Sequence, residues 1–291
     1  MVTPSRLNPE PTWLTVIRLL RWNKPAGRFI LMIPALWAVT LASDGKPPLA
    51  LMVIIILGTL ATSAAGCVIN DLWDRDIDPQ VQRTRTRPLA EKSLSVKVGI
   101  VIAFIALGCA GSLAFYLNDL SFWLCVAALP VIICYPLAKR IFPLPQLVLS
   151  LAWGFAVLIS WTAVTAQLEL SAWLLWGATV FWTLGFDTVY AMSDREDDKK
   201  IGINSSALFF GSYAADAVGV FFAITAVFLT SLGIVLKLKV GFWITVTIAL
   251  IGWIVQYFYL RSTKVPKSIY GEIFCQNVLL GFLLLIGMIF A

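Results

Sequence analysis

The sequence predicts an all-α, polytopic membrane protein with nine transmembrane helices bundled around a central cavity. Of its 291 residues, 59% are hydrophobic and only 13% are charged, whereas soluble domains average about 25% charged residues. The apolar residues form runs of about 20, the length at which a helix crosses a bilayer core. The 12 Trp residues also fit, because Trp is enriched at membrane interfaces.

The apolar runs define nine expected spans. We expect each to be a helix, because a lipid environment offers no water to satisfy backbone polar groups. Residues 1–26 are predicted to form a cytoplasmic tail with an interfacial helix, and residues 27–291 a single transmembrane domain. The first apolar run starts late and lacks a cleavage site, so we do not interpret it as a secretory signal. The expected spans are 27–43, 48–70, 96–117, 120–138, 144–164, 170–191, 211–236, 240–260 and 270–290.

The basic residues predict the orientation in the membrane. With a cytoplasmic N-terminus, all but Lys46, Lys237 and Lys239 of the 22 basic residues fall on the cytoplasmic side, as the positive-inside rule requires. We therefore expect a multi-pass protein of an inner or plasma membrane, or of an organelle membrane such as the thylakoid. The net charge of +6 is interpreted as an orientation signal and a contact with anionic lipid, with no nucleic-acid partner.

Two residue types restrict the chemistry. The chain has no His, which excludes His-ligated metal sites, Ser-His triads and imidazole catalysis. Its five Cys residues lie inside expected spans without a CxxC pair, and we interpret them as small buried packing residues.

Nine of the 16 acidic residues lie in two clusters, on the predicted cytoplasmic loops after the second and sixth spans. In the first, "NDLWDRDID", a continued helix would turn Asp71, Asp74 and Asp78 to one face, within about 60° of one another. Asp76 would point away. In the second, "DTVYAMSDREDD", Asp187, Asp194 and Asp198 would share a face with Asp197 beside them.

Two facing stripes of carboxylates would repel one another unless a cation lay between them. Carboxylate oxygens without Cys or His select Mg²⁺ or Ca²⁺. Because Mg²⁺ is typically held by one or two carboxylates together with substrate phosphates, the two clusters predict a phosphate-bearing substrate bridged by Mg²⁺.

Basic side chains near the same membrane edge supply possible phosphate ligands. They follow the first cluster, end the fourth span and precede the first span: Arg83, Arg85 and Arg87; Tyr135, Lys139 and Arg140; Arg21, Lys24 and Arg28. The alternative for these residues alone is a solvated face or a topology signal. Ser205 and Ser206 are expected to cap a helix, with a substrate contact as the alternative.

The quoted motifs resemble those of one known family. "NDLWDRDID" fits the pattern NDxxDxxxD, and "DREDD" fits DxxxD, of the UbiA superfamily of intramembrane aromatic prenyltransferases. With "LLRWNKPAGRF" and "YPLAKRIFPLPQ", the resemblance covers nearly the whole chain and is greatest to the 4-hydroxybenzoate polyprenyltransferase branch. Asn23 departs from the Asp expected in that branch.

The resemblance implies a substrate pair and a reaction. A long polyprenyl diphosphate such as solanesyl diphosphate would bind through Mg²⁺, with its tail in a lipid-facing tunnel. It would ionise, and 4-hydroxybenzoate would attack at its 3-position, a membrane step of ubiquinone or plastoquinone synthesis. No obligate protein partner is expected.

The resemblance also assigns roles to numbered residues. The metal ligands would be Asn70, Asp71, Asp74, Asp78, Asp194, Asp197 and Asp198. The substrate-binding residues would be Arg21, Lys24, Arg28, Arg83, Arg87, Tyr135, Lys139 and Arg140. The residues with catalytic roles would be Asp71, Asp187, Tyr190 and Lys139.

Three alternatives remain. Within the superfamily, the acceptor could be homogentisate, dihydroxynaphthoate, chlorophyllide or haem. An ion or solute transporter also places acids in membrane spans, but near the midplane and with broken helices. A CDP-alcohol phosphotransferase would need a DGxxAR motif, which this sequence lacks.

Overall fold

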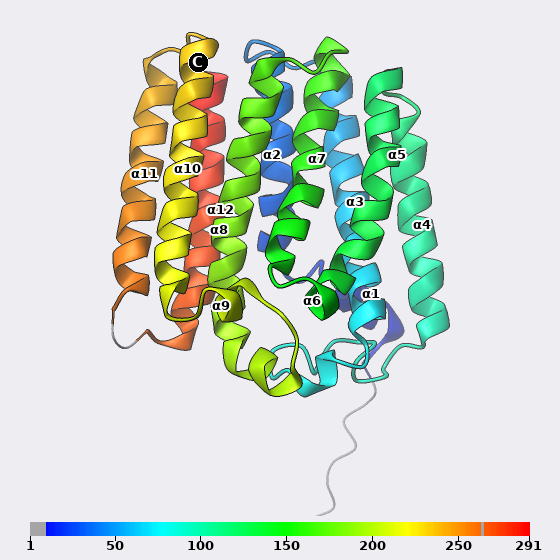
Figure 1. The fold of residues 1–291 in the computed structure, drawn as a ribbon. Coiled ribbons are helices and arrows are strands. Elements are labelled where there is room, and N and C mark those ends of the chain that lie inside the picture. Colours follow the sequence, from blue (N-terminus) through cyan, green and yellow to red (C-terminus); the bar gives the residue numbers. More distant parts are fainter. Residues whose placement is uncertain (1–9, 263–264) are drawn as a thin grey trace, which may run out of the picture.

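The computed structural model describes residues 10–262 and 265–291, and across them the chain forms helices and no strand. The predicted all-α class is therefore confirmed for this part of the chain. Long helices stand side by side in one bundle, and the short helices α1, α6 and α9 gather at one end of it (Figure 1). We call this end the site end. The C-terminus lies at the opposite end.

The α-helices have the following bounds: α1 Thr12–Leu19, α2 Ala26–Ala42, α3 Leu49–Asp74, α4 Val96–Ala114, α5 Asp119–Cys134, α6 Ala138–Ile141, α7 Pro145–Thr165, α8 Leu170–Ile201, α9 Ser206–Phe209, α10 Ala214–Val235, α11 Val240–Leu260 and α12 Lys267–Ile289. Three single turns of 3-10 helix complete the described secondary structure: η1 Asp78–Gln80, η2 Tyr135–Leu137 and η3 Gly211–Tyr213.

Seven helices of the described chain are long and apolar enough to cross a membrane, which confirms seven of the expected spans. They are Leu49–Asp74, Val96–Ala114, Asp119–Ile141, Pro145–Thr165, Gly211–Val235, Val240–Leu260 and Lys267–Ile289. The other two expected spans, 27–43 and 170–191, fall in α2 and α8. The first has only 17 residues, and the second runs on into a charged segment. Both stand within the same bundle (Figure 1).

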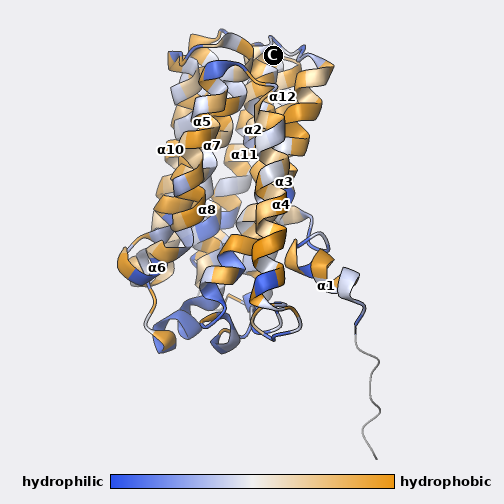
Figure 2. Cartoon of the chain, turned by 90° about the vertical axis from the view of Figure 1, so that its right-hand side faces the viewer, coloured by the Kyte–Doolittle hydropathy of each residue, from blue (hydrophilic) through white to orange (hydrophobic). Residues whose placement is uncertain are grey.

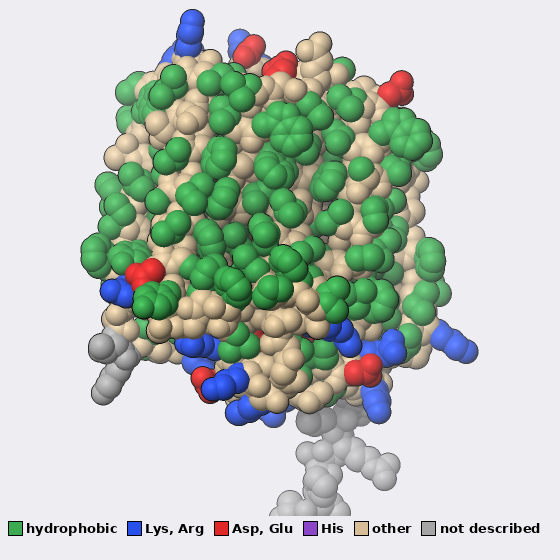
Figure 3. Space-filling model, viewed as in Figure 1, with side chains coloured by type: hydrophobic (Ala, Val, Ile, Leu, Met, Phe, Trp, Pro, Cys, Tyr) green, Lys and Arg blue, Asp and Glu red, His purple; other side chains and the backbone are tan. Residues whose placement is uncertain are grey.

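The surface of the bundle has the character of an integral membrane protein. Hydrophobic side chains cover its sides, while Lys and Arg side chains gather mainly around the site end (Figure 3). The same division is visible along the ribbon, where hydrophilic residues concentrate in the segments of the site end (Figure 2). Apolar side chains are left on the outside because lipid tails solvate them as well as a protein core does.

The two acidic clusters were predicted on loops, and the structure corrects this for all but Asp76 and Asp78, which follow the end of α3. Asn70, Asp71 and Asp74 belong to the last turns of α3. In the second cluster α8 continues to Ile201, so Asp194 and Asp198 are helical. This helix ends at Gly202, whose φ of 78° suits glycine at a helix C-terminus.

The prediction that the five cysteines are buried packing residues is also wrong. Cys109, Cys134 and Cys275 are exposed, and Cys67 and Cys125 are only partly buried. Cys67, Cys125 and Cys275 line a cavity inside the bundle. At Cys109 and Cys134 a small apolar thiol on the outside of a membrane bundle faces lipid and not water, so burial is not required of it.

A buried polar cluster joins α8, α11 and α12. The Asn277 carbonyl accepts hydrogen bonds from the indole N–H groups of Trp182 and Trp253, at 3.0 and 3.1 Å. Its amide donates to Gln256 Oε1 and to the Ile273 carbonyl, each at 3.0 Å. Asn277 is fully buried, so this one side chain fixes the register of three helices.

We predict that Asn277→Ala lowers the free energy of unfolding by about 1–3 kcal/mol, because two buried indole donors lose their acceptor. Titration with SDS of each protein in detergent micelles unfolds it and measures this difference in the free energy of unfolding. The control is Gln167→Ala, at an exposed position between α7 and α8, for which we expect a change within about 0.5 kcal/mol. Equal stability of the two variants would contradict the role of Asn277.

Candidate functional site

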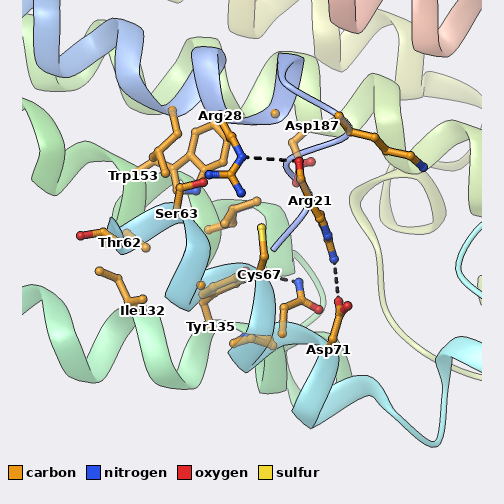
Figure 4. Close-up of a pocket in the computed structure, with 18 of the residues that line it drawn as sticks. Arg21, Arg28, Thr62, Ser63, Cys67, Asp71, Ile132, Tyr135, Trp153 and Asp187 are labelled. Carbon is orange, nitrogen blue, oxygen red and sulfur yellow. Dashed lines mark hydrogen bonds and ion pairs between the residues drawn. The ribbon is translucent and has the colours of Figure 1, made fainter. Parts of the chain in front are cut away.

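A cavity of about 920 Å³ opens inside the bundle. Its walls come from α2, α3, α4, α5, α7, α8 and α12, together with the segments that follow α1, α3 and α8. Charged and amide side chains line it at the site end, and apolar side chains of α3, α4, α5 and α7 line the remainder. Figure 4 shows part of this cavity. The division suits a ligand with an ionic head and an apolar tail.

The first acidic cluster reaches the cavity through two elements. Asp71 and Asp74 lie on the last turns of α3 and are 1% and 3% exposed. The helix stops at Asp74, so its predicted continuation to Asp78 is wrong. A turn then bonds the Ile77 N–H to the Asp74 carbonyl at 2.8 Å. Burial of Ile77 anchors this turn, and Asp78 still lines the same cavity, 3% exposed.

Each of these buried carboxylates is paired with a cation. Arg21 Nη2 lies 2.7 Å from Asp71 Oδ1, and Lys139 Nζ lies 2.5 Å from Asp74 Oδ2. Arg87 Nη1 bridges two of them, at 2.8 Å from Asp78 and 3.1 Å from Asp71. Burial by itself lowers the pKa of Arg21, but the charge of Asp71 and the hydrogen bond to it, together with smaller contributions from Cys67 and Tyr135, raise the net pKa. The guanidinium therefore stays charged.

The segment that carries Arg87 is held in place by apolar contacts. Leu89 and Leu94 are buried against Leu19 of α1 and against Ala65 and Val68 of α3. These contacts place residues 75–95 across the site end, so that Arg83 and Arg87 both line the cavity.

The second acidic cluster meets the first across the cavity. Arg83 makes a two-pronged contact with Asp194, at 2.9 Å from Nε and 2.6 Å from Nη2 to Oδ2, although the residues are 111 positions apart. Its guanidinium also lies 4.6 Å from the Tyr190 ring centroid, and Nη1 donates to Tyr190 Oη at 3.2 Å. Burial and the neighbouring Asp194 charge raise the pKa of Asp198 to about 6, partly offset by a hydrogen bond with Ser205.

Within the described part of the chain, two buried oxygen atoms of cavity-lining side chains have no hydrogen-bond partner. Asn70 Oδ1 and Asp74 Oδ1 are buried and unpaired, which is costly unless a further ligand completes them. Hard oxygen donors of this kind suit Mg²⁺. Among the described residues, however, no three acidic or Cys side chains converge closely enough to hold a metal ion alone. The donor set therefore fits Mg²⁺ when the substrate supplies further oxygen ligands.

Most other predicted site residues also line the cavity. Tyr135 Oη accepts from Asn70 Nδ2 at 3.2 Å. Arg28 is 7% exposed and donates to the carbonyls of Leu20 and Arg21. Figure 4 draws the contact with Arg21. Asp187, Tyr190 and Lys24 are further lining residues.

Two predicted site residues do not line the cavity. Asp197 accepts a hydrogen bond from the Gln82 backbone N–H at 3.2 Å, and Arg140 donates to the Trp73 carbonyl at 2.6 Å. Both contacts tie the site-end segments to helices. Ser205 is confirmed as a helix cap, accepting from the Leu208 N–H at 3.4 Å, and it also lines the cavity.

Sequence reasoning missed several lining residues. Cys67 and Ser63 of α3, Trp153 of α7 and Phe274 of α12 all face the cavity. The signal that could have found the α3 residues is their spacing, because Ser63, Cys67, Asn70 and Asp74 follow the three- and four-residue repeat of one helix face.

Fold and site together define an integral membrane protein with an amphipathic cavity, whose ionic end pairs two groups of aspartates with arginine and lysine. The sequence profile of the UbiA prenyltransferase family matches residues 31–286. The chain belongs to this family.

The relatives extend over the whole chain. It is 64% identical over 289 residues to a 4-hydroxybenzoate solanesyltransferase of Synechocystis sp., covering 99% of both chains. It is 40% identical over 266 residues to a 4-hydroxybenzoate octaprenyltransferase of Neisseria meningitidis, covering 91% of this chain and 89% of the relative.

Solved structures share the fold. A UbiA homolog from Aeropyrum pernix K1 superposes with a TM-score of 0.79 at 23% identity, covering 90% of this chain and 96% of the other. A UbiA homolog from Archaeoglobus fulgidus, bound to GPP and Mg²⁺, gives a TM-score of 0.71 at 21% identity and covers 93% and 99%.

We predict that Lys139→Met destabilises the protein in the absence of metal and substrate. The substitution leaves the buried Asp74 carboxylate without its cation, at a cost of about 1.5–3 kcal/mol. Adding Asp74→Asn should restore part of the lost stability, because the double variant removes both charges. Unfolding of the wild type, the two single variants and the double variant is compared in EDTA, which gives the coupling energy between the two residues. Strictly additive losses of stability would refute the pairing.

Proposed function

We propose that this protein transfers a long polyprenyl group from a polyprenyl diphosphate to the 3-position of 4-hydroxybenzoate, in quinone biosynthesis. The observation that carries the proposal is the cavity, in which buried Asp71, Asp74 and Asp78 face Asp194 and Asp198 at the ionic end of an apolar chamber. The identity to the 4-hydroxybenzoate solanesyltransferase of Synechocystis supports the acceptor and a long donor such as solanesyl diphosphate.

The diphosphate would bind at the ionic end. Asn70, Asp71, Asp74 and Asp78 would hold Mg²⁺ on one side, and Asp194 and Asp198 on the other. These residues would hold Mg²⁺ together with the diphosphate, and the metal would supply positive charge that offsets the charge of the leaving group. Asp197 and Arg140 lie outside the lining, so we assign them to positioning the site-end segments and not to ligand contact.

The basic residues would stabilise the charge that develops on the diphosphate as it leaves. Arg83, Arg87 and Lys139 line the cavity in ion pairs with Asp194, Asp78 and Asp74. A diphosphate with its metal would exchange these partners, so that the same cations donate to phosphate oxygens. Preformed donors of this type contribute most where water is excluded.

The acceptor would lie next to the ionic end. Arg21, Lys24 and Arg28 enter the cavity from the segment before α2 and its first turn, and one of them would bind the carboxylate of 4-hydroxybenzoate. The acceptor ring carbon forms the new bond to the allylic cation and then loses its proton. Asp187 or Asp71 would accept that proton. Tyr190 lies on α8, as Asp187 does, and its ring packs against Phe274 of α12.

The membrane arrangement follows the charge distribution. We place the site end, with its ring of Lys and Arg side chains, in the cytoplasm and count α2 and α8 among nine spans. Helix α1 would lie along the interface with Trp13, which is 63% exposed.

Membranes containing the protein should consume labelled 4-hydroxybenzoate and solanesyl diphosphate only when Mg²⁺ is present. Chelation with EDTA should abolish product formation, and added Mg²⁺ should restore it, because the carboxylates alone cannot hold the diphosphate. Chromatography of the labelled product measures both effects, with a panel of other aromatic acceptors run in parallel. Undiminished turnover in EDTA would refute the metal site, and preference for another acceptor would reassign the substrate.

Asp74→Asn should lower kcat/KM by about 100-fold or more, because a buried ligand to the diphosphate site loses its charge. Asp76→Asn is the matched control from the same motif, since the Asp76 side chain is 76% exposed and, among the residues that the structure describes, pairs only with Arg75. Its activity should stay close to that of the wild type. Full activity of Asp74→Asn in a folded protein would exclude Asp74 from the site.

A further inference from the structure

We infer that Gly58 of α3 sets the length of polyprenyl chain that the cavity accepts. The inference rests on the proposed function and adds to it a residue that determines donor specificity.

One face of α3 lines the cavity over most of the helix. The lining residues recur at three- and four-residue intervals and begin near the end of the bundle opposite the site: Ile54, Ile55, Gly58, Thr59, Thr62, Ser63, Gly66, Cys67, Asn70, Asp71 and Asp74. The cavity therefore follows the helix from the ionic end toward the far end. The same helix face that carries the aspartates forms the floor of the apolar part.

The direction of the donor is fixed by charge. Asp74 is 3% exposed, lines the cavity and leaves Oδ1 without a partner, so the ionic head of the ligand belongs at this end. The tail must then run toward Gly58. Gly58 precedes Asp71 by 13 residues, and at 1.5 Å per residue it lies about 20 Å further along the helix. Gly66 lies about 7 Å along the same path.

Neither glycine is needed for helix packing. A Cβ atom added at Gly58 or Gly66 would meet no atom within 4 Å. By contrast, a Cβ at Gly154 would lie 2.5 Å from Trp176, and one at Gly185 would lie 2.5 Å from Phe222. Those two glycines permit close contact between protein groups, whereas the space beside Gly58 and Gly66 is cavity.

Small residues also occur on the neighbouring helices. Ala110 and Ala114 of α4, with Cys125 and Ala128 of α5, line the apolar part of the cavity beside larger side chains such as Leu113 and Ile132. A polyprenyl chain is wide because each unit bears a methyl group, so the space left by Gly, Ala and Cys beside these larger side chains gives it room. A larger side chain at Gly58 would occupy that room without displacing any protein atom.

The test compares Gly58→Leu with Gly108→Leu. Gly108 lies on α4 outside the cavity lining, and a Cβ there also meets nothing within 4 Å. Both substitutions replace glycine in a helix by a better helix former, so both proteins should fold. The variants are assayed for kcat and KM with geranyl, farnesyl and solanesyl diphosphates, with 4-hydroxybenzoate and Mg²⁺.

Gly58→Leu should lower kcat/KM for solanesyl diphosphate by about tenfold or more, because the leucine side chain would occupy space that the long tail needs. Geranyl diphosphate, whose tail ends before Gly58, should be used as well as by the wild type. Gly66→Leu should also lower kcat/KM for farnesyl diphosphate, since it narrows the cavity nearer to the diphosphate group. Gly108→Leu should leave all three donors unaffected.

Several outcomes would overturn the inference. Use of solanesyl diphosphate by Gly58→Leu at the wild-type rate would do so, as would an equal loss for all three donors or an equal loss in Gly108→Leu. Should Gly58→Leu fail to fold, as measured by thermal unfolding, the series Gly58→Ala and Gly58→Val must show a loss for the long donor that grows with side-chain volume. A wild-type protein inactive with every donor would instead refute the proposed function.

Discussion

A carboxylate buried at the edge of a membrane is stable only when a cation compensates it, and this constraint governs the site end of the protein. Asp71, Asp74 and Asp78 are each at most 3% exposed. Uncompensated burial of one such charge would cost several kcal/mol. Arg21, Arg87 and Lys139 meet that requirement from three separate segments of the chain.

The cations also assemble the site. Arg21 brings the segment before α2 to the end of α3, and Arg83 ties residues 75–95 to α8 through Asp194 and Tyr190. Lys139 joins the turn after α5 to the end of α3 through Asp74. The Lys139 carbonyl also accepts from the Asn204 N–H at 2.8 Å, and this hydrogen bond holds the segment before α9 at the site end. The interactions that neutralise the carboxylates therefore close the cavity at one end. An incoming diphosphate with its metal would compete for the same charges.

The other end of the cavity depends on packing. Asn277 locks α8, α11 and α12 into a rigid half of the bundle, supported by the stacked pair of Trp253 and Phe222. In the other half, α3 presents small side chains to the interior and leaves a continuous space between α3, α4, α5 and α7. The two halves together enclose one chamber with an ionic end and an apolar end.

The sequence by itself determined the class of the protein and the identity of its charged residues. Apolar runs of span length can only be helices in lipid. The two aspartate clusters predicted a site for a phosphate group together with a hard cation. Helix periodicity grouped Asp71 with Asp74 correctly, since both lie on the end of α3. It wrongly continued the helix to Asp78, because the spacing of residues along a helix does not show at which residue the helix ends.

Only the tertiary structure decided which of these residues meet. The pairing of Arg83 with Asp194 joins positions 111 residues apart, and Asp197 and Arg140 turn to backbone partners although they lie in the same motifs as lining residues. The cavity itself is equally a tertiary property. Gly58 and Gly154 are the same residue type within apolar helices, but one borders open space and the other touches an indole ring. The difference arises because the space beside a side chain is fixed by the neighbouring helices, which its own segment of sequence does not specify.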